Sequence, residues 1–171
     1  HLVGLGLGGI VALEYARDHA RVETLTLLGT AADPSGVDPM TLYAPRDDPD
    51  SLRETTERAL SDEFVERFPA AVEDVATWRA DDDADEAGWT AQSAAIEGYE
   101  VADPYEIPVP SLVLHGTDDG VWPTSGGEAL ADALPRGEFE AVEAAGHLVQ
   151  VEASEAINDR LFGRAEAEEE F

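Results

Sequence analysis

Two short apolar segments that flank a helix at the start of the chain constrain its fold more than any other feature. Residues 2–5 and 22–28 have the composition of buried strands, and residues 9–19 between them have the length of a helix. Two strands joined through one helix form a β-α-β unit, whose strands run parallel. The sequence therefore predicts an α/β fold with a mostly parallel sheet.

The strand pattern returns near the end of the chain, after a long helical interruption. Strands are predicted at residues 110–115 and 139–142, and helices at residues 125–134, capped by Ser125, and 154–162. The interruption is predicted to hold four helices, which begin near Ser51, Ser61, Pro69 and Asp85, and Ser51 with Glu54 is expected to form the capping box of the first. The chain is thus expected to consist of a core of residues 1–32, a helical cap insertion of residues 33–107 and a second core segment of residues 108–171.

The net charge of the chain restricts the classes of partner it can bind and the salt concentration in which it can fold. It has 38 Asp and Glu residues against ten basic residues, all of them Arg, which gives a net charge of −28. Such a charge repels nucleic acid and anionic membranes, and in dilute buffer it also opposes compact folding. At molar salt the Debye length falls to roughly 3 Å, so this repulsion is screened. We therefore expect a protein of a halophilic organism, with neither nucleic acid nor a membrane as its partner.

Several kinds of site are excluded by what the chain lacks. It has no cysteine, which excludes disulfides, thiolate zinc sites and a cysteine nucleophile. Its longest apolar stretch, residues 2–13, is too short to span a bilayer and lacks the basic flank of a signal peptide, so a cytoplasmic protein is predicted. The acidic run at residues 81–85 fails as a calcium loop, because Glu86 and Gln92 stand where Gly and Glu are required. No metal site and no cofactor is predicted.

A glycine-rich turn joins the first strand to its helix and has two interpretations. Gly4, Gly6 and Gly9 satisfy the pattern G-x-G-x-x-G, whose backbone amides bind the pyrophosphate of a dinucleotide at a helix N-terminus. That pattern also needs an acidic residue at the end of the second strand to hold the ribose. The nearest acid, Asp33, falls in the following loop. Dinucleotide binding therefore remains an alternative, but the acidic residue that would hold the ribose is not at the expected position.

The second interpretation rests on a family resemblance. The segment Gly4-Leu5-Gly6-Leu7-Gly8 resembles the nucleophile elbow G-x-S-x-G of the α/β-hydrolase family, in which a strand turns sharply into a helix. The position at which the family carries its nucleophilic serine is Gly6 in this chain. The resemblance implies that the backbone amide of Leu7 is one donor of an oxyanion hole.

Two later loops resemble the other catalytic loops of that family, in the same chain order. The segment Gly116-Thr117-Asp118-Asp119 resembles the loop that carries the triad acid, with Asp119 at the acid position and Asp118 as the alternative. The segment Ala145-Gly146-His147 resembles the loop of the triad histidine. Histidine suits a general base because it titrates near neutral pH, and a buried carboxylate sets its tautomer.

The resemblance implies an activity and also its loss. Residues 58–69 and 107–119 resemble the enol-lactonase and esterase branch of the family, of which 3-oxoadipate enol-lactonase is typical. The implied reaction is hydrolysis of a small carboxylic ester or lactone through an acyl-enzyme, without a cofactor. Because Gly6 has no hydroxyl for His147 to activate, the chain as written is expected to be inactive or crippled. The alternatives are activation of water by His147 and ligand binding without catalysis.

The resemblance spans nearly all of this chain but only the C-terminal two-thirds of the family's fold. The chain begins at His1, and the first strands of the family and its upstream oxyanion loop have no counterpart here. The strand at residues 2–5 would then form an exposed apolar edge, which, unless something covers it, predicts marginal folding or self-association.

Several large side chains are expected to serve packing. Four of them recur at near-helical spacing and are predicted to pack the insertion onto the core and, as a second role, to line a substrate pocket. These four are Trp78, Trp89, Ile96 and Tyr99. His115 is expected to pack at the end of its strand rather than to act in catalysis.

Overall fold

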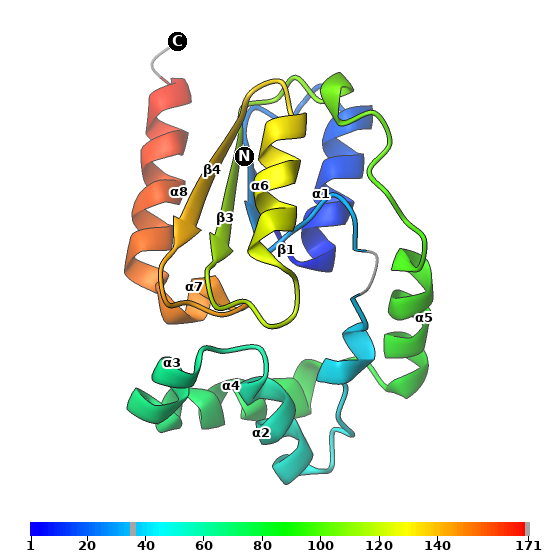
Figure 1. Ribbon diagram of the computed structural model, residues 1–171, viewed down its shortest axis with the longest axis vertical. Coiled ribbons are helices and arrows are strands. Elements are labelled where there is room, and N and C mark those ends of the chain that lie inside the picture. Colours follow the sequence, from blue (N-terminus) through cyan, green and yellow to red (C-terminus); the bar gives the residue numbers. More distant parts are fainter. Residues whose placement is uncertain (35–36, 170–171) are drawn as a thin grey trace.

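Four parallel strands form the sheet in a computed structural model that describes residues 1–34 and 37–169, with side chains described up to residue 163 (Figure 1). They are β1 (Leu2–Leu5), β2 (Leu25–Leu28), β3 (Ser111–Gly116) and β4 (Gly137–Val142), and they pair in that order. The predicted parallel sheet is confirmed. β2 begins later than the sequence suggested, because residues 19–22 form a turn after the first helix.

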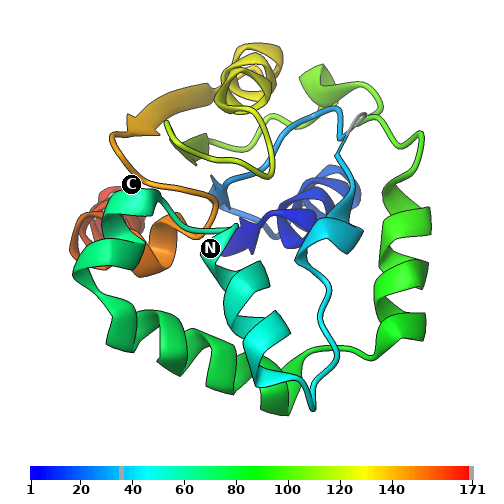
Figure 2. The ribbon, with the colours of Figure 1, turned by 60° about the horizontal axis from the view of Figure 1, so that its bottom comes forward.

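Helices cover both faces of the sheet, because successive residues of a strand point to opposite sides. On one face, α1 (Leu7–Asp18) and α6 (Thr124–Ala133) pack against Leu25, Leu27 and Val113. On the other face, α7 (Val149–Glu152) and α8 (Ser154–Glu169) pack against Leu28 and Leu114. Figure 2 shows α8 on one side of the strands and α1 with α6 on the other. The core therefore consists of two apolar layers separated by the sheet.

The helical segment between β2 and β3 forms a cap on one end of the sheet. It contains two short helices, η1 (Pro39–Leu42) and η2 (Pro104–Glu106), and four longer ones, α2 (Pro49–Glu57), α3 (Asp62–Arg67), α4 (Pro69–Asp82) and α5 (Glu86–Ile96). In Figure 1, α2, α3 and α4 lie beyond the carboxyl ends of the strands. Ligands of open α/β sheets bind at that end. The cap therefore covers the region where a site is expected.

Local capping decides where the cap helices begin. Ser61 and Asp85 precede α3 and α5 as predicted, and each caps its helix by accepting a hydrogen bond from the amide three residues further along the chain. The predicted capping by Ser51 is wrong, because Asp48 caps α2 and accepts a hydrogen bond from the amide of Ser51 at 3.1 Å. Pro49 favours this earlier start, since proline suits the first helical position.

The start of α6 differs from its prediction in the same way. Ser125 does not cap the helix, which begins one residue earlier and directly after Pro123. The hydroxyl of Thr124 instead donates to the carbonyl oxygen of Gly116 at 2.7 Å. This bond ties the start of α6 to the end of β3, beside the loop of Asp119.

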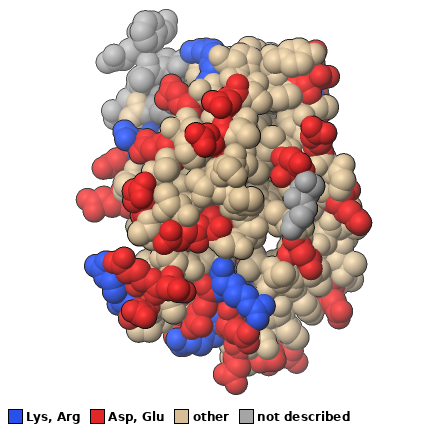
Figure 3. Space-filling view, in the orientation of Figure 1, with Lys and Arg blue, Asp and Glu red and all other residues tan. Residues whose placement is uncertain are grey.

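Acidic side chains are spread over the face of the molecule that Figure 3 shows, and most arginines of this face gather on the cap. Several arginines of the cap pair with an acid one helical turn away, such as Arg53 with Glu57 and Arg67 with Glu63. Because the chain has 38 acidic residues against ten arginines, such pairs leave most of its negative charge uncompensated. Within the described residues, no helix combines the length and the apolar character needed to cross a membrane.

Candidate functional site

The turn from β1 into α1 places Gly6 at the carboxyl end of the sheet. Gly6 has φ 51° and ψ −121°, in the left-handed region that glycine adopts without steric strain. Its amide donates to the carbonyl oxygen of Leu28 at 2.9 Å, and its own carbonyl accepts from the hydroxyl of Thr30 at 3.1 Å. The backbone of residue 6 is therefore held to β2 and its following loop on both sides.

Two neighbouring glycines let the first strand, the helix and the loop after β2 approach closely. A Cβ on Gly4 would lie 2.5 Å from Cα of Gly9, and a Cβ on Gly9 would lie 2.0 Å from Oγ1 of Thr30. By contrast, a Cβ on Gly8 would meet nothing within 4 Å. Close packing thus accounts for two glycines of the dinucleotide pattern, and Asp33 lies in an exposed loop beyond the end of β2.

His147 faces residue 6 from the loop between β4 and α7. A Cβ built on Gly6 would lie 3.1 Å from Nε2 of His147. The imidazole is 8% exposed, and a Cβ on Gly29 at the end of β2 would lie 3.1 Å from its Nδ1. The small residue at position 29 therefore leaves the space that the ring occupies.

Asp119 binds the other edge of the His147 ring. Nδ1 of His147 lies 2.9 Å from Oδ2 of Asp119, whose side chain is fully buried. Oδ1 of the same carboxylate accepts hydrogen bonds from the amides of Val121 at 2.8 Å and Trp122 at 2.9 Å. The loop after β3 thus orients the carboxylate toward His147.

The charge of Asp119 determines where the hydrogen of His147 resides. Burial alone would raise the pKa of Asp119, but the hydrogen bonds from His115 and His147 outweigh it and hold that pKa well below its usual value. An ionised carboxylate only accepts hydrogen bonds, so Nδ1 of His147 is the donor in this contact, and Nε2 is the nitrogen that faces Gly6. The alternative acid Asp118 is exposed and does not contact His147.

A third side chain, His115, contacts the same carboxylate. Its ring is fully buried at the end of β3, and its Nε2 lies 3.0 Å from Oδ2 of Asp119 and 3.0 Å from the carbonyl oxygen of Trp122. The expected burial of His115 is confirmed, whereas its contact with Asp119 was missed. The signal that could have indicated it is the spacing of four residues across a turn that follows a buried strand.

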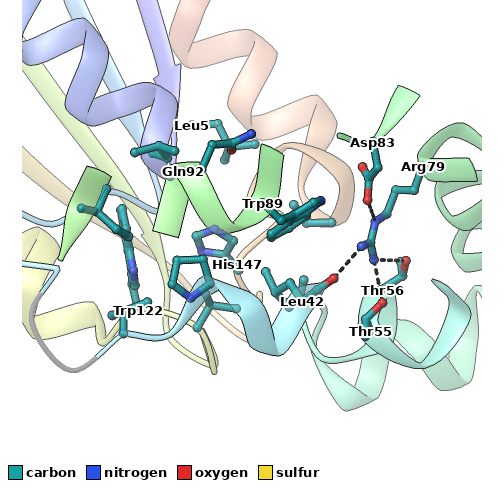
Figure 4. A pocket seen from close by; sticks show the side chains of 18 residues that line it. Leu5, Leu42, Thr55, Thr56, Arg79, Asp83, Trp89, Gln92, Trp122 and His147 are labelled. Atoms are coloured by element: carbon teal, nitrogen blue, oxygen red, sulfur yellow. Dashed lines mark hydrogen bonds and ion pairs between the residues drawn. The ribbon is translucent and has the colours of Figure 1, made fainter. Parts of the chain in front are cut away.

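A pocket of about 240 Å³ opens beside Gly6 and His147 (Figure 4). Its wall combines the turn after β1, the loop after β3 and the cap. Much of that wall is apolar, and this part includes Leu5, Leu42, Trp89, Ile96, Trp122 and Leu148. Such a pocket accepts a compact, largely apolar molecule and brings it next to Nε2 of His147.

Arg79 closes the cap end of the pocket and ties the cap helices together, as the dashed lines in Figure 4 show. Its Nε lies 2.9 Å from the carboxylate of Asp83, and its terminal nitrogens bind the carbonyl oxygen of Leu42 at 2.6 Å and the hydroxyls of Thr55 and Thr56 at 3.0 Å. The guanidinium is mostly buried, and its charge is paired. This end of the pocket is therefore both held in place and close to neutral.

The four side chains predicted to pack the cap onto the core are found in different surroundings: Trp78, Trp89, Ile96 and Tyr99. Trp89 and Ile96 line the pocket. Tyr99 packs against the core, and its hydroxyl donates to the carboxylate of Glu14. The predicted packing of Trp78 is wrong, since its side chain is 62% exposed and α4 turns its aliphatic side inward instead.

Two residues of the acidic run between α4 and α5 stabilise the end of α4 and the start of α5. Asp83 pairs with Arg79, and Asp85 accepts a hydrogen bond from the amide of Gly88. Among the residues that the structure describes, no three His, Asp or Glu side chains gather as metal ligands.

Comparison with known proteins places this geometry in a family. A model of the alpha/beta hydrolase family matches residues 1–160, whereas no curated protein matches the sequence. A meta-cleavage product hydrolase from Pseudomonas fluorescens superposes with a TM-score of 0.79 at 21% identity, over 96% of this chain and 65% of that chain. An esterase from Thermogutta terrifontis has a TM-score of 0.76 and 24% identity, over 98% and 64%. An enol-lactonase from Burkholderia xenovorans has a TM-score of 0.73 and 27% identity, over 94% and 63%.

The three structures share the fold of this chain but are longer. The chain spans less than two-thirds of the length of each. The similarity therefore assigns the fold, and the chemistry must be argued from the residues of this chain.

Proposed function

Because the chain belongs to the alpha/beta hydrolase family, we propose that its pocket is a site for hydrolysis of small carboxylic esters or lactones, with residue 6 at the nucleophile position. The observation that carries the proposal is the separation of 3.1 Å between Nε2 of His147 and a Cβ built on Gly6. The esterase and the enol-lactonase among the similar structures support this substrate class. The size and apolar wall of the pocket suit a compact substrate.

In this proposal Asp119 and His147 work as a pair that moves one proton. A hydroxyl at residue 6 would give its proton to Nε2 of His147 while its oxygen bonds to the carbonyl carbon of the substrate. Leu7 is the first residue of α1, so its amide has no acceptor within the helix and would donate to the developing oxyanion. His147 then protonates the leaving alcohol, and a water that loses its proton to Nε2 releases the acid. One ester and one water thus give one acid and one alcohol.

Glycine at residue 6 removes the nucleophile from this sequence of steps. Loss of the serine in a serine triad lowers turnover by a factor on the order of 10⁶. Glycine also tolerates the positive φ of residue 6, which would strain any other side chain. The chain as written therefore keeps the backbone conformation of this turn and is expected to be inactive or crippled in acyl transfer.

Restoring the hydroxyl tests the proposal. The substitution Gly6→Ser should produce hydrolysis of p-nitrophenyl acetate at least ~10³-fold faster than the unaltered chain, because the two other members of the triad are already oriented. Gly8→Ser is the matched control, since position 8 lies in the same turn but has open space around it. His147→Ala in the Gly6→Ser background should abolish the gain. A folded Gly6→Ser chain no faster than Gly8→Ser would overturn the proposal.

Ligand binding without catalysis is the second candidate function, and the pocket itself favours it. The pocket is formed although residue 6 has no hydroxyl, and Trp89 and Trp122 in its wall can report binding by fluorescence. Saturable binding of an uncharged ester such as ethyl butyrate without turnover would support this candidate. Turnover by the unaltered chain that His147→Ala abolishes would instead favour activation of water by His147.

The proposal includes the setting in which the protein works. The net charge of −28 favours location in a salt-rich cytoplasm, because salt screens the repulsion among so many carboxylates on one surface. The partners are then small-molecule esters or lactones, handled without a cofactor, and copies of the same chain that meet along β1.

A further inference from the structure

The carboxylate of Asp119 is shared by two imidazole rings. Oδ2 lies 2.9 Å from Nδ1 of His147 and 3.0 Å from Nε2 of His115. The ring of His115 and the side chain of Asp119 are both fully buried. The proposed hydrolysis uses His147 and Asp119 but gives His115 no part. A buried titratable ring in contact with the reacting pair therefore needs an explanation.

The neighbours of His115 determine which of its nitrogens carries the hydrogen. Nε2 lies within 3.0 Å of two oxygens, Oδ2 of Asp119 and the carbonyl oxygen of Trp122. An ionised carboxylate and a carbonyl can only accept, so Nε2 must be the donor. Nδ1 is buried and has no hydrogen-bond partner in the described structure. A hydrogen on Nδ1 would be left unsatisfied, which favours the tautomer with the hydrogen on Nε2.

Helix α6 approaches the ring of His115 closely on its Nδ1 side. A Cβ on Gly127 in α6 would lie 2.5 Å from Nδ1, so only glycine at position 127 permits this placement of the ring. The backbone of α6 therefore lies against the Nδ1 edge of the ring, while its Nε2 edge faces Asp119.

We propose that His115 is a positioning residue, whose Nε2–H holds Oδ2 of Asp119 in the place from which it orients His147 toward residue 6. The role rests on the function proposed above, because it acts through the Asp119–His147 pair. The amides of Val121 and Trp122 hold Oδ1. Oδ2 meets His147 on one side and, on the other, Nε2 of His115, which lies 3.0 Å from it and also binds the carbonyl oxygen of Trp122. With both oxygens held, the carboxylate cannot rotate, and His147 keeps Nε2 aimed at the reacting atom.

The unaltered chain gives the first test, by ¹⁵N–¹H correlation of its imidazole rings in molar KCl at neutral pH. His115 should appear as the neutral tautomer with the hydrogen on Nε2, and His147 as the tautomer with the hydrogen on Nδ1. The proton on Nδ1 of His147 should be shifted downfield and exchange slowly with water. Observation of His115 with a hydrogen on Nδ1 would overturn the proposal, and no variant is needed to see it.

Substitutions of His115 separate positioning from bulk packing. His115→Gln keeps an amide nitrogen at the position of Nε2, whereas His115→Leu keeps the volume without a donor. In His115→Leu the Nδ1 proton of His147 should exchange about tenfold faster or more, because the bond to a charged acceptor is lost. In His115→Gln it should remain close to the unaltered chain. Leu114→Ala, in the adjacent buried position on the opposite face of the strand, controls for general loss of stability.

The outcomes distinguish this role from the proposed function. A folded His115→Leu chain whose Nδ1 proton exchanges no faster than in Leu114→Ala would overturn the positioning role. In the Gly6→Ser background, His115→Leu should lower kcat by about tenfold with little change in KM, and His115→Gln should restore it. An inactive Gly6→Ser chain would sink the proposed hydrolysis, while the imidazole spectra would still decide how His115 acts on Asp119.

Discussion

Glu152 accepts hydrogen bonds from both the amide and the hydroxyl of Ser61, although 91 residues separate the two in the chain. The amide distance is 3.2 Å, and the same carboxylate also accepts from the amide of Gly146 at 2.8 Å. Ser61 begins α3 of the cap, and Gly146 precedes His147. One carboxylate thus joins the cap to the loop that carries the proposed base.

Removing that carboxylate should loosen both parts. We expect Glu152→Gln to lower the free energy of unfolding by about 1–3 kcal/mol, because one acceptor oxygen is replaced by a donor that faces other donors. Urea unfolding followed by far-UV circular dichroism measures the change. Glu155→Gln, at an exposed position in the first turn of α8, is the matched control. Equal effects of the two substitutions would contradict the role of Glu152.

Asp119 should make stability depend on pH in a known direction. Its pKa is lowered on folding, so its contribution is present above its unfolded pKa of about 4 and is lost as the pH falls further. Asp119→Asn should therefore be less stable than the unaltered chain by about 1.5–3 kcal/mol at pH 7, and the difference should shrink below about pH 4.

The comparison across pH needs a control, because many other carboxylates titrate in the same range. Asp118→Asn changes the charge equally at the neighbouring exposed position. It should leave the free energy of unfolding nearly unchanged at every pH. A difference for Asp119→Asn that stays constant down to pH 3 would show that the charge of Asp119 does not stabilise the fold.

The net charge predicts a strong dependence on salt. Between about 0.1 M and 2 M KCl the Debye length falls from roughly 10 Å to below 3 Å, so the midpoint of thermal unfolding should rise by at least ~5 °C. Calorimetry measures the midpoint. Sucrose is the control, because excluded solutes stabilise proteins without screening charge. A midpoint that is highest at low salt would refute the halophilic interpretation.

The edge of the sheet predicts self-association. Within the described chain β1 pairs only with β2, and Val3 on β1 is 47% exposed. In concentrated salt we expect species larger than a monomer by sedimentation, and Val3→Lys should shift them toward the monomer by placing a charge on the edge. Val11→Lys, on the exposed side of α1, should not. A monodisperse monomer that melts cooperatively in concentrated salt would contradict this prediction.

The sequence predicted the parallel sheet and the helical segment, because these depend on local patterns. The proximity of Asp119 and His147 was expected only from the resemblance of their loops to those of the α/β-hydrolase family. Apolar runs mark strands, and Ser61 and Asp85 mark helix starts within a few residues. It misplaced the start of α2, since Asp48 and Ser51 both suit a cap and only the position of Pro49 separates them.

Local sequence patterns could not predict the contacts between segments that are distant in the chain. The bond from His115 to Asp119 depends on how the loop after β3 folds back, and the bonds of Glu152 depend on where the cap docks. The exposure of Trp78 has the same cause, since a helix pattern alone does not tell which side of α4 meets the rest of the cap.

The central claim is that Asp119 and His147 are oriented as the acid and the base of a hydrolase site whose nucleophile position, residue 6, has no side chain. Its most direct test is covalent labelling of Gly6→Ser with a fluorophosphonate, a reagent that reacts with activated serines, followed by mass spectrometry. The account predicts one adduct, located on residue 6, that is absent from the unaltered chain, from Gly8→Ser and from Gly6→Ser with His147→Ala. A folded Gly6→Ser chain without an adduct, or one labelled equally well after His147→Ala, would contradict it.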